Sequence, residues 1–163
     1  MFRREFTKSL LSLPFFSFLG VKPKDNEECI VVDQRKDTCC VIDVDGTIRF
    51  YKNGQLHRDN DLPAVIQEDG SKQWYKNGKH HRDNDLPAIV FSKGNQYWYQ
   101  HGKQHRDSDQ PAMIINGSQY WYYNDQPHRN GDQPAVIHAN GGQLWYKNGQ
   151  LHRDNDLPAV IQE

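Results

Sequence analysis

The feature that most constrains this chain is a unit of about 24 residues that occurs five times within its 163 residues. A tyrosine that follows another aromatic residue marks each unit. These tyrosines are Tyr51, Tyr75, Tyr99, Tyr122 and Tyr146, spaced 24, 24, 23 and 24 residues apart. The shorter interval lacks one residue between Pro111 and Gly117, and residues 51–68 and 146–163 are identical. Such a period predicts a repeat architecture in which each unit packs against its neighbours.

Each unit carries a His-Arg pair, an aspartate three residues after the arginine, and a Pro-Ala pair that begins two residues after the aspartate. The recurring polar positions are His57, Arg58 and Asp61; His81, Arg82 and Asp85; His105, Arg106 and Asp109; His128, Arg129 and Asp132; and His152, Arg153 and Asp156. A catalytic site is built once, so a set that occurs five times favours a structural role. We expect Arg82 to pair with Asp83 or Asp85, and Asp85 to accept backbone N–H groups around the proline turn. The chain is therefore predicted not to be an enzyme.

Two turn signals in each unit predict β-hairpins. One is exemplified by Asn77-Gly78 and the other by Asp69-Gly70. Both suit type I′ turns, which need a positive φ at two positions. Pro87 cannot donate a hydrogen bond within a sheet, so the segment around it must bulge or turn. We favour two strands per unit with the second strand bent there. The alternative is three strands with the aspartate-rich stretch as a loop.

These patterns predict an all-β fold, an antiparallel meander of tandem hairpin repeats that forms one elongated, twisted sheet. Neighbouring side chains on a strand face opposite sides, so Trp74 and Tyr75 would place an aromatic row on each face. The chain divides into a signal-like or anchor segment at 1–22, a linker and capping hairpin at 23–43, and repeats at 44–163. Residues 28–33 and 38–43 are the expected capping hairpin.

The N-terminal segment places Arg3-Arg4, Phe6 and Lys8 ahead of an apolar stretch at residues 10–21, which resembles a twin-arginine export signal. The alternative is an apolar tail that folds onto the repeats. No small-residue cleavage motif follows, so the segment also suits an uncleaved anchor. The protein would be exported or envelope-associated if this signal functions, and otherwise cytoplasmic. Membrane contact is expected only through residues 1–22.

Charge and cysteine content point away from several kinds of ligand. The formal net charge of −1 does not suit nucleic-acid binding, which usually needs a basic surface. No Cys-x-x-Cys spacing is present, and histidines of neighbouring units would lie about 9.6 Å apart, too far to share one zinc ion. We expect no metal and no cofactor. Cys29 either forms a disulfide with Cys39 or Cys40, or all three remain thiols.

The segment from Trp74 to Arg82, WYKNGKHHR, resembles a MORN (membrane occupation and recognition nexus) repeat. Tyr75, Gly78 and His81 match the aromatic, glycine and histidine positions of that family. The chain is also similar to the variant MORN repeats of bacterial YwqK-type antitoxin proteins. This resemblance implies β-hairpin meanders that serve protein–protein contact, dimerisation and scaffolding, and lipid binding has also been attributed to the family. Arg82 stands where the family has a glycine, so we expect a different strand geometry after the histidine.

The expected function is protein–protein interaction or scaffolding on an extended β surface, with a protein partner or self-association. Residues 158–163 stop short of the next turn signal, which predicts an unpaired strand edge suited to dimerisation or strand addition. The alternative is a glycan-binding module of the cell envelope, because the aromatic rows resemble those of cell-wall-binding repeats. Its candidate binding residues are Trp74, Trp98, Trp121 and Trp145.

Overall fold

The computed structural model describes residues 28–33 and 38–162, and the export-like segment at residues 1–22 lies outside them. The described part of the chain contains strands, turns and loops and no helix, which confirms the all-β meander. The first strands are β1 (Glu28–Asp33), β2 (Thr38–Ile42) and β3 (Ile48–Lys52), which pair antiparallel in chain order. The segments expected to form a hairpin ahead of the repeats thus extend the repeat sheet itself.

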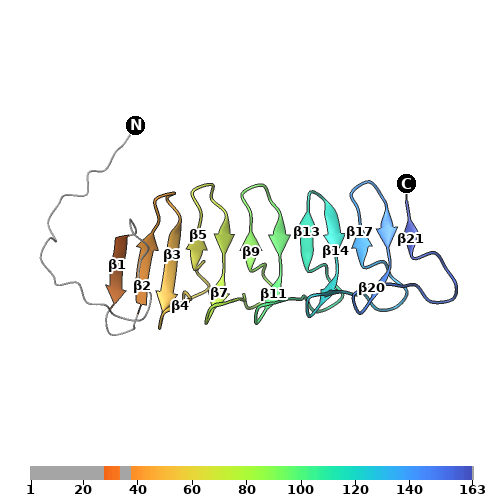
Figure 1. The fold of residues 1–163 in the computed structure, drawn as a ribbon, viewed down its shortest axis with the longest axis horizontal. Helices are drawn as coiled ribbons and strands as arrows, with labels where there is room; N and C mark the ends of the chain where they lie inside the picture. The colour runs from red at the N-terminus through yellow and green to blue at the C-terminus, as the bar shows by residue number, and fades with distance from the viewer. Residues whose placement is uncertain (1–27, 34–37, 163) are drawn as a thin grey trace, which may run out of the picture.

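The main sheet lengthens by two short strands with every unit, and its order in space follows the chain (Figure 1). After β3 the strands are β5 (Val65–Ile66), β6 (Lys72–Gln73), β9 (Ile89–Val90), β10 (Gln96–Tyr97), β13 (Met113–Ile115), β14 (Ser118–Tyr120), β17 (Val136–Ile137), β18 (Gln143–Leu144) and β21 (Val160–Ile161). With β4 (Gln55–Leu56), which pairs with β3, the described residues form a 13-stranded sheet. The strands lie across the long axis of the molecule, as Figure 1 shows.

A second row of hairpins runs along one edge of this sheet (Figure 1). The hairpins are β7–β8 (Tyr75–Lys76, Lys79–His80), β11–β12 (Tyr99–Gln100, Lys103–Gln104), β15–β16 (Tyr122–Tyr123, Gln126–Pro127) and β19–β20 (Tyr146–Lys147, Gln150–Leu151). The prediction of two strands per unit holds for the main sheet. The prediction of one long, bent second strand is wrong, because the chain leaves the sheet at each tryptophan, forms a small hairpin, and returns through the aspartate-rich loop.

The Asn-Gly turns are of the predicted type. Asn77 and Gly78 have φ values of 52° and 75°, and Lys76 pairs with Lys79 across this two-residue turn. Asparagine and glycine tolerate left-handed backbone better than other residues, so the local sequence fixes this turn. Each small hairpin therefore forms where it was expected.

The other turn signal was assigned the wrong geometry. At Asp69-Gly70 only the glycine has a positive φ (86°), and a three-residue loop is closed by a 2.9 Å hydrogen bond from the Gln67 N–H to the Ser71 carbonyl. The Asp69 carboxylate accepts the Ser71 N–H at 2.8 Å and stabilises the loop. The unit that lacks one residue instead has a two-residue turn at Asn116-Gly117, with φ values of 47° and 82°. The missing residue thus shortens one loop and leaves the strands in register.

The aspartate-rich stretch contains a third tight turn that was predicted only as a bulge or loop. Asn84 and Asp85 have φ values of 61° and 54°, and the Leu86 N–H approaches the Asp83 carbonyl at 3.4 Å. Two successive left-handed residues reverse the chain, and Pro87 then directs it back to the sheet. The corresponding turns begin after Asp59, Asp107 and Asp154 and have the same signs of φ.

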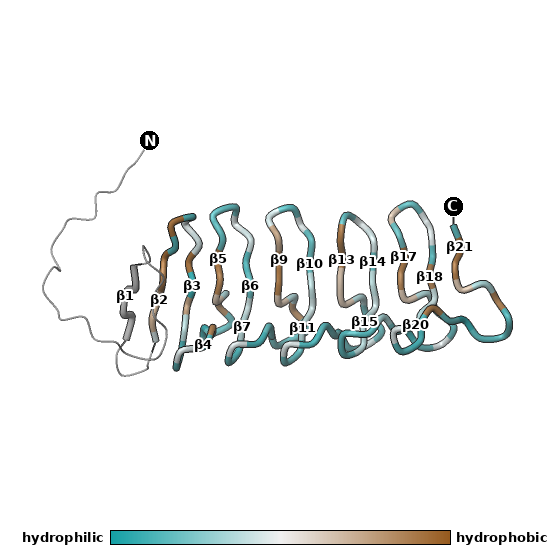
Figure 2. Tube along the Cα trace, viewed as in Figure 1, coloured by the Kyte–Doolittle hydropathy of each residue, from teal (hydrophilic) through white to brown (hydrophobic). Residues whose placement is uncertain are grey.

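The core is thin and depends on alanine and tryptophan. Ala64, Ala88, Ala112 and Ala135 are fully buried. The carbonyl of Ala88 accepts the Trp74 N–H at 2.7 Å, a close approach of two chain segments that leaves room for only a small side chain. Hydrophobic segments therefore occupy the middle of the main sheet, and polar turns line its two long edges (Figure 2).

Candidate interaction surface

Each tryptophan lies beneath the arginine of its own unit. The guanidinium of Arg82 is 3.8 Å from the ring centre of Trp74, a cation–π contact. The same arginine donates to both carboxylate oxygens of Asp61, in the preceding unit, from Nε at 2.8 Å and from Nη2 at 2.7 Å. It also donates to the Pro87 carbonyl at 3.4 Å. Arg82 thus contacts the Trp74 ring, the proline turn of its own unit and the preceding repeat.

The same aspartate also holds the tryptophan through its backbone. The indole N–H of Trp74 donates to the Asp61 carbonyl at 3.0 Å. Asp61 therefore accepts hydrogen bonds from both the tryptophan and the arginine of the next unit. We call this set of tryptophan, arginine and preceding aspartate the inter-repeat clamp. Its other copies are Trp98, Arg106 and Asp85; Trp121, Arg129 and Asp109; and Trp145, Arg153 and Asp132. In the first unit, Arg58 stacks at 3.6 Å over Phe50 instead.

The predicted pairing of Arg82 with Asp83 or Asp85 is wrong. Arg82 reaches back 21 residues to Asp61, while Asp85 serves Arg106 of the following unit. The reason is the type I′ turn, which places each aspartate on the side of its loop that faces the next repeat. The Arg82 guanidinium lowers the pKa of the Asp61 carboxyl below its usual value.

The recurring histidines also connect neighbouring units. Nε2 of His81 lies 2.9 Å from Oδ1 of Asp83, and Nδ1 accepts the His101 N–H at 3.2 Å. Because Nδ1 accepts this bond, the proton of the neutral ring lies on Nε2. His57 and His128 accept the N–H of Asn77 and Asn148 in the same way, both at 3.1 Å.

The unit with the altered hairpin departs from this pattern. Nδ1 of His105 is buried and has no hydrogen-bond partner among the described residues. The turn above it is Asn124-Asp125, and the Asp125 carboxylate accepts the Gln104 N–H at 2.7 Å. Aspartate at φ 69° is less favourable than glycine, but its side chain supplies an inter-repeat bond that glycine lacks.

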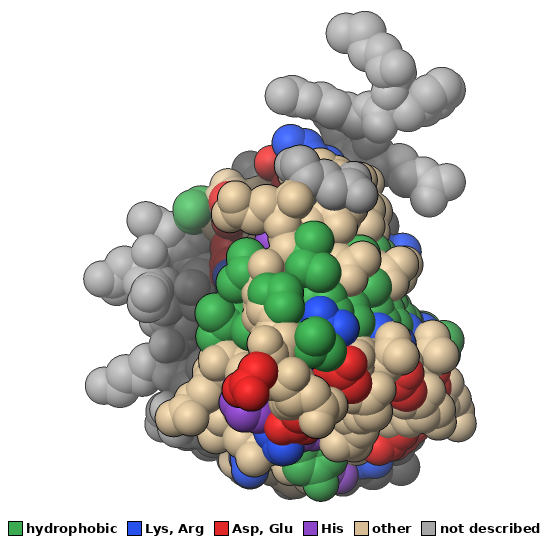
Figure 3. Space-filling model, turned by 90° about the vertical axis from the view of Figure 1, so that its right-hand side faces the viewer, with side chains coloured by type: hydrophobic (Ala, Val, Ile, Leu, Met, Phe, Trp, Pro, Cys, Tyr) green, Lys and Arg blue, Asp and Glu red, His purple; other side chains and the backbone are tan. Residues whose placement is uncertain are grey.

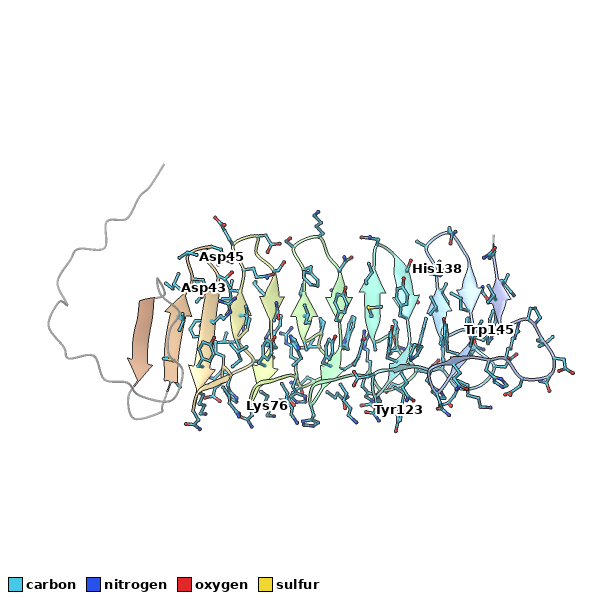
Figure 4. The ribbon with its side chains drawn as sticks, viewed as in Figure 1. Asp43, Asp45, Lys76, Tyr123, His138 and Trp145 are labelled. Carbon is cyan, nitrogen blue, oxygen red and sulfur yellow. The ribbon has the colours of Figure 1, made fainter. Side chains whose placement is uncertain are left out.

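The four tryptophans selected as candidate glycan-binding residues have exposed fractions of only 5–8%. Trp145, labelled in Figure 4, lies between the main sheet and the hairpin row, with Arg153 at 3.8 Å from its ring centre. One ring face is therefore occupied by the arginine, and the indole N–H is used by the preceding aspartate. This arrangement does not present the indole rings to a sugar.

A polar aromatic cluster on the hairpin row was not foreseen from the sequence. The ring of His80 lies 4.0 Å from that of Tyr75 and 5.1 Å from that of Tyr99. Nε2 of His80 and the Tyr75 hydroxyl are each 3.1 Å from Oε1 of Gln73. Burial lowers the pKa of His80 and raises the pKa of Tyr75, because both charged forms lose hydration. His80 occurs in one unit only, so the repeat pattern gave no signal for this cluster.

The exposed side chains of the hairpin row are mixed in character. Tyr123 is 57% exposed, and Lys76 pairs with Asp83 at 3.3 Å; both labelled residues lie along the hairpin edge in Figure 4. This row and the outer turns of the main sheet, near Asp43 and Asp45 in the same view, run the length of the molecule. Both are regular surfaces with one set of groups per unit.

The residues described in the structure contain no group of three or more histidine, cysteine or acidic side chains placed to hold a metal ion. The register of β1 and β2 sets Cys29 opposite Val41 and Cys40 opposite Ile30, so neither predicted cysteine pair is directly cross-strand. The described residues also include no helix of the length and hydrophobicity that crossing a membrane requires.

Comparison with known proteins gives no assignment. No model of a known protein family matches the chain, and no curated protein matches it either.

Proposed function

We propose that this chain is a non-enzymatic repeat protein whose extended β surface binds a protein partner and serves as a scaffold. The observation that carries the proposal is the use of the recurring polar groups. Arg82, Asp61 and His81, and their equivalents, are engaged in contacts between units. Groups that hold the array together are not available as a catalytic set, and what the array offers to other molecules is its regular outer surface.

The geometry also suits the MORN-like interpretation, which we retain as part of the proposal. Tyr75 and Gly78 lie in the β7–β8 hairpin. His81 follows this hairpin and accepts the His101 N–H of the next unit. Arg82, which replaces the glycine of that family, stacks on Trp74 instead of allowing close strand approach. A rigid rod of such hairpins is suited to holding partners at fixed intervals.

The proposal is tested by affinity capture with the tagged full chain from lysate and envelope fractions of the source organism, read by mass spectrometry. We expect a reproducible protein partner that the heat-unfolded chain does not retain. The heat-unfolded chain is the matched control because it keeps the composition and loses the surface. Retention only on washed polysaccharide, with no protein enriched, would contradict the proposal in favour of glycan binding.

A second measurement separates these two outcomes without a lysate. Soluble envelope sugars should leave tryptophan fluorescence unchanged, because the indole rings are 5–8% exposed. Saturable quenching by a sugar would require an accessible indole and would contradict the described burial.

A further inference from the structure

The fourth unit carries an asparagine where the other four units carry an aspartate. This position follows the recurring histidine by two residues and is occupied by Asp59, Asp83, Asp107, Asn130 and Asp154. In every unit the side chain lies beside the histidine, with Nε2 to Oδ1 distances of 2.7–2.9 Å in the aspartate units and 3.0 Å in the fourth. The next residue differs as well, because Gly131 stands where the other units have asparagine or serine. Together the two changes place an Asn-Gly pair beside a histidine.

An asparagine that precedes a glycine can lose its side-chain amide without an enzyme. The backbone nitrogen of the glycine attacks Cγ of the asparagine side chain, and glycine hinders this attack least because it has no Cβ. The reaction is favoured when the glycine N–H is free of other hydrogen bonds. It is also favoured when a hydrogen-bond donor stabilises the negative charge that develops on the amide oxygen.

The Gly131 N–H meets the first of these conditions. Among the described residues it donates no hydrogen bond, and both Asn130 and Gly131 are exposed to solvent. A Cβ built on Gly131 would have no atom within 4 Å, so the loop has room to move. The Asn-Gly pair of the second unit differs, since the Gly78 N–H donates to the Leu56 carbonyl of the preceding unit at 2.9 Å.

His128 meets the second condition. Its Nδ1 accepts the Asn148 N–H at 3.1 Å, so the proton of the neutral ring lies on Nε2. Nε2 therefore donates to Oδ1 of Asn130 at 3.0 Å. This bond polarises the amide carbonyl, and it strengthens as negative charge builds up on Oδ1 during the attack. The inter-repeat bond from Asn148 thus fixes the tautomer that assists the reaction.

We propose that Asn130 is a self-modification site that converts to aspartate with the assistance of His128. The Gly131 nitrogen bonds to Cγ of Asn130 while the Cγ–Nδ2 bond breaks, and ammonia leaves with the proton that the Gly131 nitrogen gives up. Water then opens the resulting succinimide. Opening at Cγ yields aspartate, and opening at the main-chain carbonyl yields isoaspartate. Water is the only co-reactant, and the inference is independent of the proposed binding function.

The aspartate product gives the fourth unit the histidine–aspartate pair that the other four already have. The hydrogen bond from His81 lowers the pKa of the Asp83 carboxyl, and His128 would keep the new carboxylate ionised in the same way. Figure 3 views the rod from one end and shows acidic, basic and histidine side chains mainly in its lower half, on the side of the hairpin row. Modification therefore adds one negative charge to this surface.

The test follows the purified full chain during incubation at neutral pH, with chymotryptic peptides sequenced by tandem mass spectrometry. The readout is the small mass increase that accompanies replacement of the amide by a carboxyl group, and the Asn130→Asp chain is the standard for the aspartate product. We expect Asn130 to convert about tenfold faster than Asn116, and Asn77 to convert most slowly. One donor at a fixed oxyanion site contributes about 10²–10³-fold, and an exposed site retains only part of this.

Asn116-Gly117 is the matched control within the same chain. It forms a two-residue turn with φ values of 47° and 82°, much like the 52° and 75° of Asn77-Gly78. Among the described residues the Gly117 N–H donates no hydrogen bond, and no hydrogen bond joins the Asn116 side chain to a histidine. Comparison with Asn77 therefore isolates the effect of the N–H bond, and comparison with Asn130 isolates the effect of the histidine.

Two variants and one solvent condition complete the test. His128→Leu should slow Asn130 to about the rate of Asn116, with circular dichroism confirming the fold. Gly131→Asn restores the residue that follows this position in three other units and should slow the conversion further. In guanidinium chloride, which removes the fold, the three Asn-Gly pairs should convert at similar rates.

Two results would overturn the proposal. The first is an Asn130 rate in the folded chain that does not exceed the Asn116 rate, or a ratio of the two rates that guanidinium chloride leaves unchanged. The second is an unchanged Asn130 rate in folded His128→Leu. If His128→Leu does not fold, the comparison of the folded wild-type chain with the chain in guanidinium chloride decides the matter.

Discussion

Substitution of Asp85 tests the inter-repeat clamp most directly. Its carboxylate receives two hydrogen bonds from Arg106, both of 2.8 Å, while its carbonyl receives the indole N–H of Trp98. Asp85→Asn removes the charge and retains the carbonyl and a side chain that tolerates left-handed backbone. Asp85→Ala removes the acceptor altogether. The pair of variants separates electrostatics from backbone conformation.

The magnitude follows from the exposure of the two partners. The Asp85 side chain is 54% exposed and that of Arg106 is 16% exposed, so solvent screens the pair only partly. Exposed ion pairs contribute about 0.2–1 kcal/mol, and hydrogen bonds to well-buried charged groups about 1.5–3 kcal/mol. We expect Asp85→Asn to lower the free energy of unfolding by about 1–2 kcal/mol. Asp85→Ala should cost about 1 kcal/mol more, because alanine at a φ of 54° is strained.

The assay is urea unfolding followed by circular dichroism and tryptophan fluorescence, with midpoints compared between variants. Asp83→Asn is the control, because among the described residues Asp83 bonds only within its own unit, to His81 and Lys76, and an asparagine occupies its position at Asn130. It should change stability by less than about 0.5 kcal/mol. Equal stability of Asp85→Asn and wild type, or equal effects of Asp85→Asn and Asp83→Asn, would refute the clamp as a source of stability.

Three further predictions follow from the described contacts. The pKa of Asp61 is lowered in the folded protein. The stability that its carboxylate gives the fold is therefore present above the unfolded pKa of about 3.9 and is lost as pH falls below that value. The lowered pKa of His80 adds a second loss as pH falls below about 6.5, and His80→Gln should remove that limb from melting temperatures measured between pH 3 and 8. Ser108 has a φ of 60°, so Ser108→Asn should raise the free energy of unfolding in urea by about 0.5–1 kcal/mol, and a loss would contradict the turn assignment. Trp98→Phe leaves the Asp85 carbonyl without its indole donor and should lower stability by about 1–2 kcal/mol in the same assay, whereas an unchanged midpoint would show that the bond is not important.

The sequence predicted those features that depend on a few adjacent residues. Asn77-Gly78 forms the expected type I′ turn because positive φ is a property of the residues themselves. The two strands per unit in the main sheet also follow from turn spacing. Asp69-Gly70 was misassigned because its loop length depends on how the flanking strands pair, and the Gln67–Ser71 closure is not visible in the dipeptide.

The recurring arginine, aspartate and histidine positions make contacts between units, and the partners that the sequence suggested for Arg82 were wrong. Arg82 pairs with an aspartate 21 residues earlier, and this choice depends on how one unit sits on the next. The exit of the chain from the sheet at Trp74 has the same origin, since the indole is buried by Arg82 and fastened to Asp61. Contacts between repeats therefore determine side-chain partners and chain direction that the sequence of a single repeat does not specify.

The crosswise direction of the strands has a mechanical consequence. A pull applied at β1 and β21 acts along the row of strands, because these strands lie at opposite ends of the sheet (Figure 1). Such a load separates neighbouring strands one pair after another instead of shearing many hydrogen bonds together. Because the clamps lie in series, each carries the same load, and the weakest interface should release first. Under tension this rod should extend in steps of one repeat, and each step should be reversible once the load is removed.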